Sequence, residues 1–479
     1  MKSFQHVCFS FLVAISLLSS PINQVCAKDA GLSFTDAWML VAAENDALQA
    51  ARSEVESAGH SKDAARDLYL PEVTLSASYI YLDDDIDLSP SEILDSMAGG
   101  DQLSSLVSGL ASSYGMSAAY LESALTSTIQ DRETVISAIS AKWPIYAGGR
   151  IDAAQDIAKG KYQEATHNLQ LQSLEQFETL TRYYFGAVLA NNVFETRKEV
   201  EAGLKQHLEH AILLEQQGQI ARVERLQSEA AHDKAVVEKK KAGRDLEIAR
   251  LALTRLLKQE NSVIPADALF ANGVLPGMET MLERTLQAYP GLQLLDAKKD
   301  QVTGLLAVEK GKYYPTVGLF GSYSVYEEDS LATELTPDWF VGMGVSFPLL
   351  ERDGRSGKVK AAQSTMKKIE SLKKQARSDL TVLLEKTYRQ AEQSLEEYQG
   401  LGSSEELAKE TVKLRIKAFS QGLSTSLDVV DAELFLAGVK SQRAVALFNH
   451  VVALARLAAV SGDLSSFFQY QTSPLIEVR

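Results

Sequence analysis

The chain has 479 residues, 45% of them hydrophobic, and a formal net charge of -15 at pH 7. A chain this acidic is a poor partner for nucleic acid, whose phosphates attract basic surfaces. Its two cysteines, Cys8 and Cys26, both lie near the amino terminus, so the rest of the chain has neither a disulfide framework nor a thiol for catalysis.

Residues 1–27 have the pattern of a secretory signal peptide. Lys2 precedes an apolar run at 9–18 that is too short to span a bilayer, and small residues suit cleavage after Ala27. Lipidation of Cys26 is the alternative, which Val25 disfavours because a small residue is expected before a lipidated cysteine. No later stretch has eighteen consecutive apolar residues, so any membrane crossing must use strands.

Residues 33–67 predict a helix, which Ser33 or Thr35 can cap. A strand is expected at about 71–82, where apolar and polar residues alternate with a period of two. Its apolar face carries Val73, Leu75, Ala77, Tyr79 and Tyr81. A long acidic insert at 83–131 indicates an exposed loop with short helices, and a second strand is expected at about 134–146.

After Gly149 the apolar spacing changes to that of a helix, without a proline up to Gln217. At 1.5 Å per residue this helix is on the order of 100 Å long. The chain must turn at Gly218 and return over 224–257, before a linker at 263–277 that contains proline and glycine.

The second half predicts the same order of elements. A helix up to Gly311 precedes strands at about 315–326 and 338–349, and a long helix up to Gln421 precedes a return helix with a coiled-coil stripe. The last strand has the strongest membrane-strand signal, because large apolar residues alternate with glycine and serine. These residues are Trp339, Val341, Met343, Val345 and Phe347.

Three matches in the same order indicate an internal tandem repeat of roughly 200 residues. Leu70–Tyr79 matches Tyr314–Tyr323, Trp143–Arg150 matches Phe347–Arg355, and Gln217–Gln219 matches Gln421–Leu423. Chance similarity between low-complexity helices is the alternative. We expect a first repeat at 28–262, a second repeat at 278–465 and a C-terminal tail at 466–479.

Four strands cannot close a barrel, and an open sheet edge is not viable in lipid. Membrane-spanning strands therefore require several copies of the chain. Two copies give about eight strands with a filled interior, whereas three give about twelve strands with a lumen. A passage function favours three.

The duplicated proline-started strands, the Gly-Arg pair after each second strand and the turns at Gly218 and Gly422 resemble the TolC-type outer-membrane efflux proteins. The resemblance covers about 32–462. It implies an internally duplicated α+β membrane protein, a homotrimer with a twelve-stranded barrel and a long α-helical coiled-coil tunnel in the periplasm. It also implies passage of cargo in a tripartite efflux or type I secretion system, with an inner-membrane pump, a periplasmic adaptor and outer-membrane lipid as partners. No cofactor and no enzymatic reaction are implied.

The resemblance places a periplasmic gate at the hairpin ends. Asp428 and Asp431 lie on one helix face and match the entrance carboxylates of the family, while Glu224 and Gln227 occupy these positions in the first repeat. Three copies would form an acidic ring that attracts cations and responds to protonation. Two solvated acids on a coiled-coil surface are the alternative.

The two turns are the expected adaptor contacts, through Gly218, Gln219, Gly422, Leu423 and Ser424. Ser424 and Phe419 stand where the best-known form of the motif has Arg and Tyr, which argues against a gate held shut by ion pairs there. Aromatic residues are expected to anchor the strands at the membrane interfaces, namely Tyr79, Tyr81, Trp143, Tyr323, Trp339 and Phe347.

His207 and His210 have a spacing that can hold a metal, but the acids Glu209 and Glu215 suit a solvated surface, so we expect no metal site. No catalytic triad, Cys-His pair or phosphate loop stands out. A periplasmic coiled-coil scaffold or adaptor without a barrel is the alternative function. A soluble scaffold would not need the apolar alternation at 73–81 and 339–347.

Overall fold

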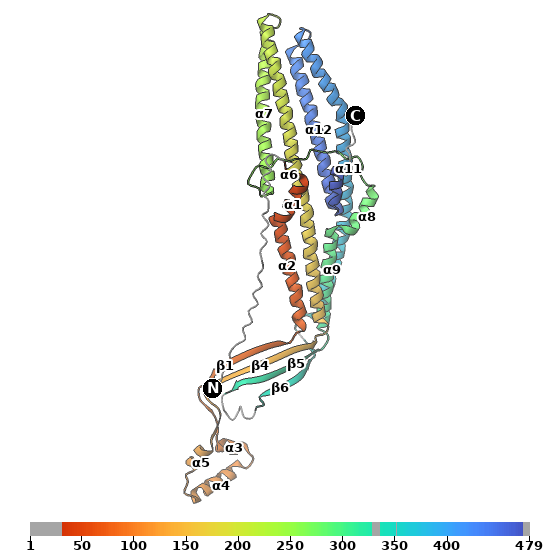
Figure 1. Cartoon of the computed structure of the whole chain (residues 1–479). Coiled ribbons are helices and arrows are strands. Elements are labelled where there is room, and N and C mark those ends of the chain that lie inside the picture. Colours follow the sequence, from red (N-terminus) through yellow and green to blue (C-terminus); the bar gives the residue numbers. More distant parts are fainter. Residues whose placement is uncertain (1–30, 328–335, 351, 473–479) are drawn as a thin grey trace, which may run out of the picture.

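The structure, a computed structural model, describes residues 31–327, 336–350 and 352–472. The expected signal peptide at 1–27 lies outside these residues. The molecule is elongated, with long helices at one end, a β-sheet at the other and a small helical insert beyond the sheet (Figure 1).

The order of helices, two long strands and a helical hairpin occurs twice. The first set is α1 (Phe34–Glu44), α2 (Asp46–Arg66), β1 (Glu72–Tyr81), β4 (Glu133–Tyr146), α6 (Arg150–Gln216) and α7 (Arg222–Leu256). The second set is α8 (Met278–Ala288), α9 (Pro290–Gly311), β5 (Thr316–Glu327), β6 (Trp339–Ser346), α11 (Arg355–Ser420) and α12 (Ser426–Ser461). The similarity between the two halves of the sequence is therefore accompanied by the same order of elements.

The first helical segment differs from the prediction of one continuous helix. Asn45 ends α1 and caps α2, since its side-chain oxygen accepts hydrogen bonds from the amides of Ala47 at 2.9 Å and Leu48 at 3.2 Å. An asparagine cap favours a break over a continuous helix. Ser33, one of the two expected caps, accepts from the Asp36 amide at 3.1 Å.

The last strand is shorter than predicted. β6 ends at Ser346, so Phe347 and Pro348 lie beyond the strand that we expected at 338–349. The partner strand β5 begins at Thr316, opposite Ser346, so the residues after Ser346 have no partner in β5.

The four long strands form one antiparallel sheet in the order β1-β4-β5-β6. The 83–131 insert contains the predicted short helices, α3 (Pro90–Ser96), α4 (Gly100–Ser113) and α5 (Ala118–Leu125). It also contains an unpredicted antiparallel ribbon of β2 (Ile86–Leu88) and β3 (Ser127–Gln130).

The largest core cluster joins α1, α6, the linker and the C-terminal helix α13 (Ser465–Thr472). Phe34, Phe177 and Phe467 are fully buried, with ring centroids 5.2 to 5.5 Å apart. The Tyr184 hydroxyl accepts from the linker amides of Ala266 and Asp267, both at 3.1 Å. Residues 466–472, expected in a tail, thus belong to a helix that completes the core.

Among the described helices, α12 alone is long and apolar enough to cross a membrane by length and composition. Its buried residues include Val451, Leu454 and Leu457, which belong to the largest core cluster. Packing inside the protein accounts for its apolar character.

Candidate functional site

The sheet has one apolar face and one more polar face. Residues that pair across antiparallel strands share a face, and one row runs through all four strands as Leu75, Ile139, Tyr323 and Trp339. The adjacent row, on the opposite face, is Thr74, Ser140, Ser322 and Phe340. The register therefore aligns the alternation of the separate strands into two distinct surfaces.

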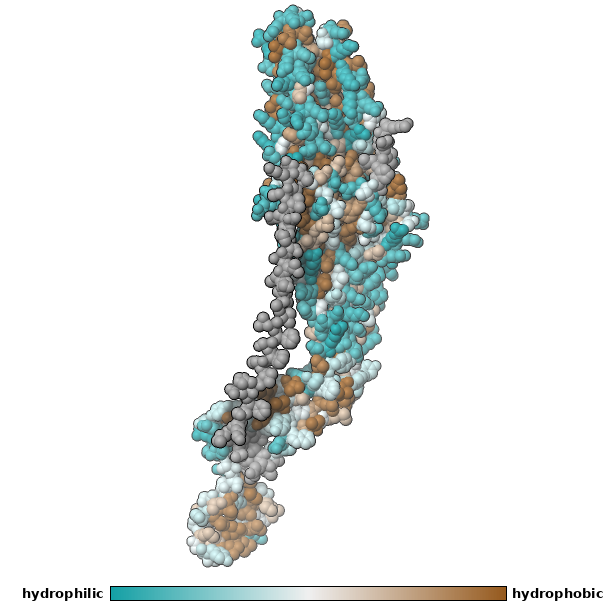
Figure 2. Space-filling view, viewed as in Figure 1, coloured by the Kyte–Doolittle hydropathy of each residue, from teal (hydrophilic) through white to brown (hydrophobic). Residues whose placement is uncertain are grey.

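The apolar face is exposed in the single chain. The exposed fraction is 71% for Leu75, 40% for Ile139, 55% for Tyr323 and 64% for Trp339. A soluble monomer rarely presents such a continuous apolar surface, whereas a membrane strand presents one to lipid. Hydrophobic surface is visible over the strands in Figure 2.

All six expected aromatic anchors are exposed. Tyr79 and Tyr81 lie toward the insert end of β1, while Trp143 lies toward the helical end of β4. The Trp143 indole N–H donates to the Tyr69 carbonyl at 2.8 Å, which fixes its ring at the junction of strand and helix. Tyr323 and Trp339 pair with each other in the sheet. Interfacial anchoring by these side chains stays a prediction.

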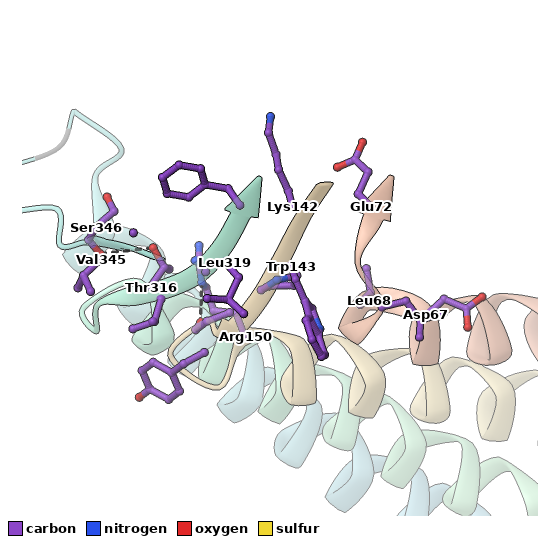
Figure 3. Close-up of a pocket in the computed structure, with 18 residues that line it drawn as sticks. Asp67, Leu68, Glu72, Lys142, Trp143, Arg150, Thr316, Leu319, Val345 and Ser346 are labelled. Carbon is purple, nitrogen blue, oxygen red and sulfur yellow. Dashed lines mark hydrogen bonds between the residues drawn. The ribbon is translucent and has the colours of Figure 1, made fainter. Parts of the chain in front are cut away.

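A cavity of about 760 Å³ lies where the sheet meets the helices. The cross-strand partners Glu72 and Lys142 extend away from the helices, and Trp143 points toward them (Figure 3). The cavity is open to solvent and has no arrangement of a nucleophile with a base. No group of three or more His, Cys, Asp or Glu that could hold a metal occurs in the part of the chain that the structure describes.

Both helical hairpins reverse through the same turn. Gly218 and Gly422 have φ of 71° and 70°, and each turn has the paired amide-to-carbonyl bonds of a Schellman motif. No described atom lies within 4 Å of where a Cβ would sit on either glycine. The left-handed backbone, and not lack of space, therefore favours glycine at these positions.

The second hairpin returns through a complete capping box. The Thr425 hydroxyl accepts from the Asp428 amide at 3.3 Å, and the Asp428 carboxylate accepts from the Thr425 amide at 2.8 Å. The carboxylate also accepts from the Thr425 hydroxyl at 2.8 Å and from the Ser424 hydroxyl at 3.0 Å. The hydrogen bonds that the carboxylate accepts, first of all the one from the Thr425 amide, lower the pKa of Asp428. Asp428 thus has a structural role at the start of α12, whereas Asp431 is simply exposed.

The first hairpin uses its corresponding acid differently. The cap position of α7 is Ala221, which offers no side-chain hydrogen bond. The Glu224 carboxylate reaches the other hairpin instead and accepts from the Ser426 amide at 3.3 Å. The carboxylates of Glu224 and Asp428 therefore both accept hydrogen bonds from backbone amides at the start of α12, although the two acids come from different repeats.

A buried polar cluster joins the two hairpins beside these acids. His207 Nε2 lies 2.8 Å from the Ser426 hydroxyl, which lies 2.6 Å from the Ser228 hydroxyl. Ser228 donates to the Glu224 carbonyl at 3.1 Å. Since each hydroxyl has one hydrogen to donate, Ser426 donates to Ser228 and His207 Nε2–H donates to Ser426.

His207 is only 4% exposed and packs on Phe419, with ring centroids 4.5 Å apart. Burial and then the neighbouring His210 lower the pKa of His207 to about 4, so the side chain is neutral at pH 7. From the sequence, His207 was weighed only as a possible metal ligand, and its burial was not predicted. The sequence held a signal, because Val200, Leu204, His207 and Ala211 follow the spacing of one buried helix face.

The outer membrane efflux protein family matches residues 39–258 and 281–463 of the chain. The chain has no match among curated protein sequences.

Solved structures with a similar fold include outer membrane channels, all of low sequence identity to this chain. A structure of CusC, described in terms of folding and transmembrane channel formation, has a TM-score of 0.72 and 12% identity over 92% of this chain and 96% of CusC. The outer membrane protein VceC of Vibrio cholerae has a TM-score of 0.68 and 13% identity over 90% of this chain and 96% of VceC. The open MtrE outer membrane channel of Neisseria gonorrhoeae has a TM-score of 0.67 and 18% identity over 90% of this chain and 89% of MtrE.

These matches confirm the family and the location that were predicted from the sequence. Because the family matches most of both halves, the chain belongs to the outer membrane efflux protein family, and its fold is that of solved outer membrane channels.

Proposed function

We propose that three copies of this chain form a passive duct through the outer membrane, which serves a tripartite efflux or type I secretion system. The observation that carries the proposal is the open four-stranded sheet. Among the described strands, β1 pairs only with β4 and β6 pairs only with β5, so both edges of the sheet are unpaired. In lipid such edges must pair with other copies, and three copies give about twelve strands around a lumen.

The two sheet faces suit this arrangement. The face with Leu75 and Trp339 would contact lipid, and the face with Thr74, Ser140 and Ser322 would line the lumen. The hydroxyls of Thr74 and Ser140 lie 2.8 Å apart, so the polar face forms its own cross-strand bonds. The long helices would continue the lumen into the periplasm.

The hairpin turns are the proposed adaptor contacts, with an inner-membrane pump supplying the energy. Leu423 is 77% exposed at its turn and Gln219 is exposed at the other. An exposed leucine next to a rigid Schellman turn offers a small apolar anchor for a partner's helical hairpin. Gly218, Gly422 and Ser424 would act by holding the two turns in shape.

We further propose that Asp431, with Asp428 and Glu224, forms an acidic ring at the periplasmic mouth of the trimer. Asp431 is the more informative acid, because its substitution leaves the capping box of α12 intact. Asp431→Asn should weaken channel block by multivalent cations, measured in planar bilayers. Glu396→Gln, which removes an exposed acid of α11 far from the turn, is the matched control. Equal block in both variants and the wild type would remove Asp431 from the ring.

The proposed function as a whole is tested by purifying the protein in detergent and adding it to a planar bilayer. We expect a trimer and discrete ion-conducting steps. A monomer that does not conduct would contradict the proposal and would favour the periplasmic scaffold.

A further inference from the structure

The insert beyond the sheet has an apolar helix face turned to solvent. On α4, Leu103, Leu106 and Leu110 are 51%, 64% and 60% exposed, and Tyr114 directly after the helix is 78% exposed. Their spacing of three and four residues places them on one side of the helix. The insert shows hydrophobic surface in Figure 2.

The leucines of α4 lie outside the packed interior of the insert. Its side toward α3 and α5 carries Ser104, Val107 and Ser108, which line a small cavity with Leu121 and Leu125. The leucines therefore do not form the interior of the insert. The more buried residues on that side are the small Val107 and Ala111, while Ser104 and Ser108 are exposed. A surface helix normally turns its large apolar residues inward, so another surface is needed to cover the leucines.

The charge of the insert argues against anionic lipid as that surface. Residues 83–131 contain nine acidic residues and no lysine, arginine or histidine. Binding to phosphate-bearing headgroups relies on basic side chains, which the insert lacks. The leucine face itself contains no charged residue, so two such faces can meet without bringing charges together.

The position of the insert indicates a second copy of the same chain. The insert follows β1 directly, and β1 is an edge strand of the sheet. In the proposed trimer, on which this step rests, each β1 edge lies at the seam with the next copy. The three inserts of the trimer therefore lie at the same end of the barrel, and each lies close to the place where two copies meet.

We infer that the leucine face of α4 packs against the α4 helices of neighbouring copies, so that the three inserts form a helical cluster at the external end of the channel. Leu103, Leu106 and Leu110 supply a contact surface of the kind that joins helices in bundles. The surface that covers the leucine face of α4 is therefore the leucine face of α4 in another copy of the chain.

Cysteine crosslinking of the intact protein in outer-membrane preparations tests this inference. Cys8 and Cys26 both precede the expected cleavage point, so a single introduced thiol is specific. Leu106→Cys, treated with a short bis-maleimide, should give a dimer-sized band in a denaturing gel, and Leu103→Cys should give the same band. Ser105→Cys is the matched control, because it is exposed on a different side of α4, and it should give no such band.

An unheated gel of the same samples separates the two proposals. If the trimer is present and Leu106→Cys crosslinks no more than Ser105→Cys, the inference about α4 is overturned while the proposed function stands. If no trimer is present, the proposed function fails and the inference fails with it.

Discussion

The two hairpin ends of this chain share one turn but differ in how the returning helix begins. Gly218 and Gly422 have nearly the same φ and the same bonds around them. After the turn, α12 starts with the Thr425–Asp428 capping box, whereas α7 starts at Ala221 without a side-chain cap. The freed carboxylate of Glu224 then reaches the Ser426 amide of the other hairpin.

This difference shows how a duplicated chain can join its halves. A hairpin that satisfied its own cap would leave Glu224 occupied, and the contact between repeats would lose one of its bonds. The buried network of His207, Ser228 and Ser426 lies at the same contact between the two hairpins, which we call the joint. The matching positions of the other repeat do not carry this set of residues. Divergence at a few residues therefore creates the contact that fixes one hairpin against the other.

The largest effect that we expect at this joint is a dependence of stability on pH. The pKa of His207 is about 4 in the folded chain and about 6.5 when unfolded. The unfolded chain thus takes up the proton first, and stability falls as the pH drops from about 6.5 to about 4, by about 3 kcal/mol. Urea unfolding of the detergent-solubilised protein, followed by circular dichroism at several pH values, should show this loss.

The matched variant is His207→Gln, which cannot be protonated. It should be less stable than the wild type at pH 7 but should lose less stability toward pH 4. His450 is also buried and has a lowered pKa, but it is present in both proteins and its contribution cancels. Equal pH dependence in the two proteins would show that His207 is not buried as described.

Removal of the central hydroxyl should have the next largest effect. Ser426→Ala leaves the buried His207 Nε2–H without a partner, while Ser228 keeps its hydrogen bond to the Glu224 carbonyl. The unpaired buried donor costs about 1–3 kcal/mol of unfolding free energy. Ser420→Ala, at an exposed position just before the turn, should change the urea midpoint little. If both variants unfolded at the same urea concentration, the hydrogen bonds of Ser426 would not stabilise the contact between the two hairpins.

The shared turn predicts equal effects in the two hairpins. Gly218→Ala and Gly422→Ala each place a Cβ on a left-handed residue, which costs about 1 kcal/mol or slightly more. Thermal unfolding midpoints should fall by similar amounts. A clear difference between the two midpoints would mean that the turns are not equivalent in the assembled protein.

The smallest effects should have opposite signs in the two hairpins. Thr425→Ala removes a helix cap and should destabilise by about 1 kcal/mol. Ala221→Ser supplies the missing side-chain acceptor for the first amides of α7 while Glu224 keeps its bond to the Ser426 amide, and it should stabilise α7 by about 0.5 kcal/mol. Hydrogen exchange of the first amides of α7 and α12 measures both changes. Faster exchange in α7 of Ala221→Ser would contradict the capping comparison.

Much of the architecture was predictable because it follows from local patterns. Alternation predicted the strands, and glycine after a long helical pattern predicted the turns at 218 and 422. The break at Asn45 was missed because the residues on both sides favour helix. The early end of β6 was missed because it depends on where the partner strand β5 begins. The contact of His207 with Ser426 joins residues 219 positions apart, and a single sequence carries no pattern for such a pairing. Asp428 was selected as a gate residue without its capping role, although Thr425 and Asp428 have the three-residue spacing of a capping box before an apolar helix.

The most direct test of the central claim is gel electrophoresis of the outer-membrane fraction from cells that express the chain, with and without heating. Unpaired edges on β1 and β6 predict a trimer-sized band in the outer membrane that converts to a monomer on heating. A monomer found only in the soluble periplasmic fraction would contradict the claim, because the exposed apolar face of the sheet would then have no lipid to cover it.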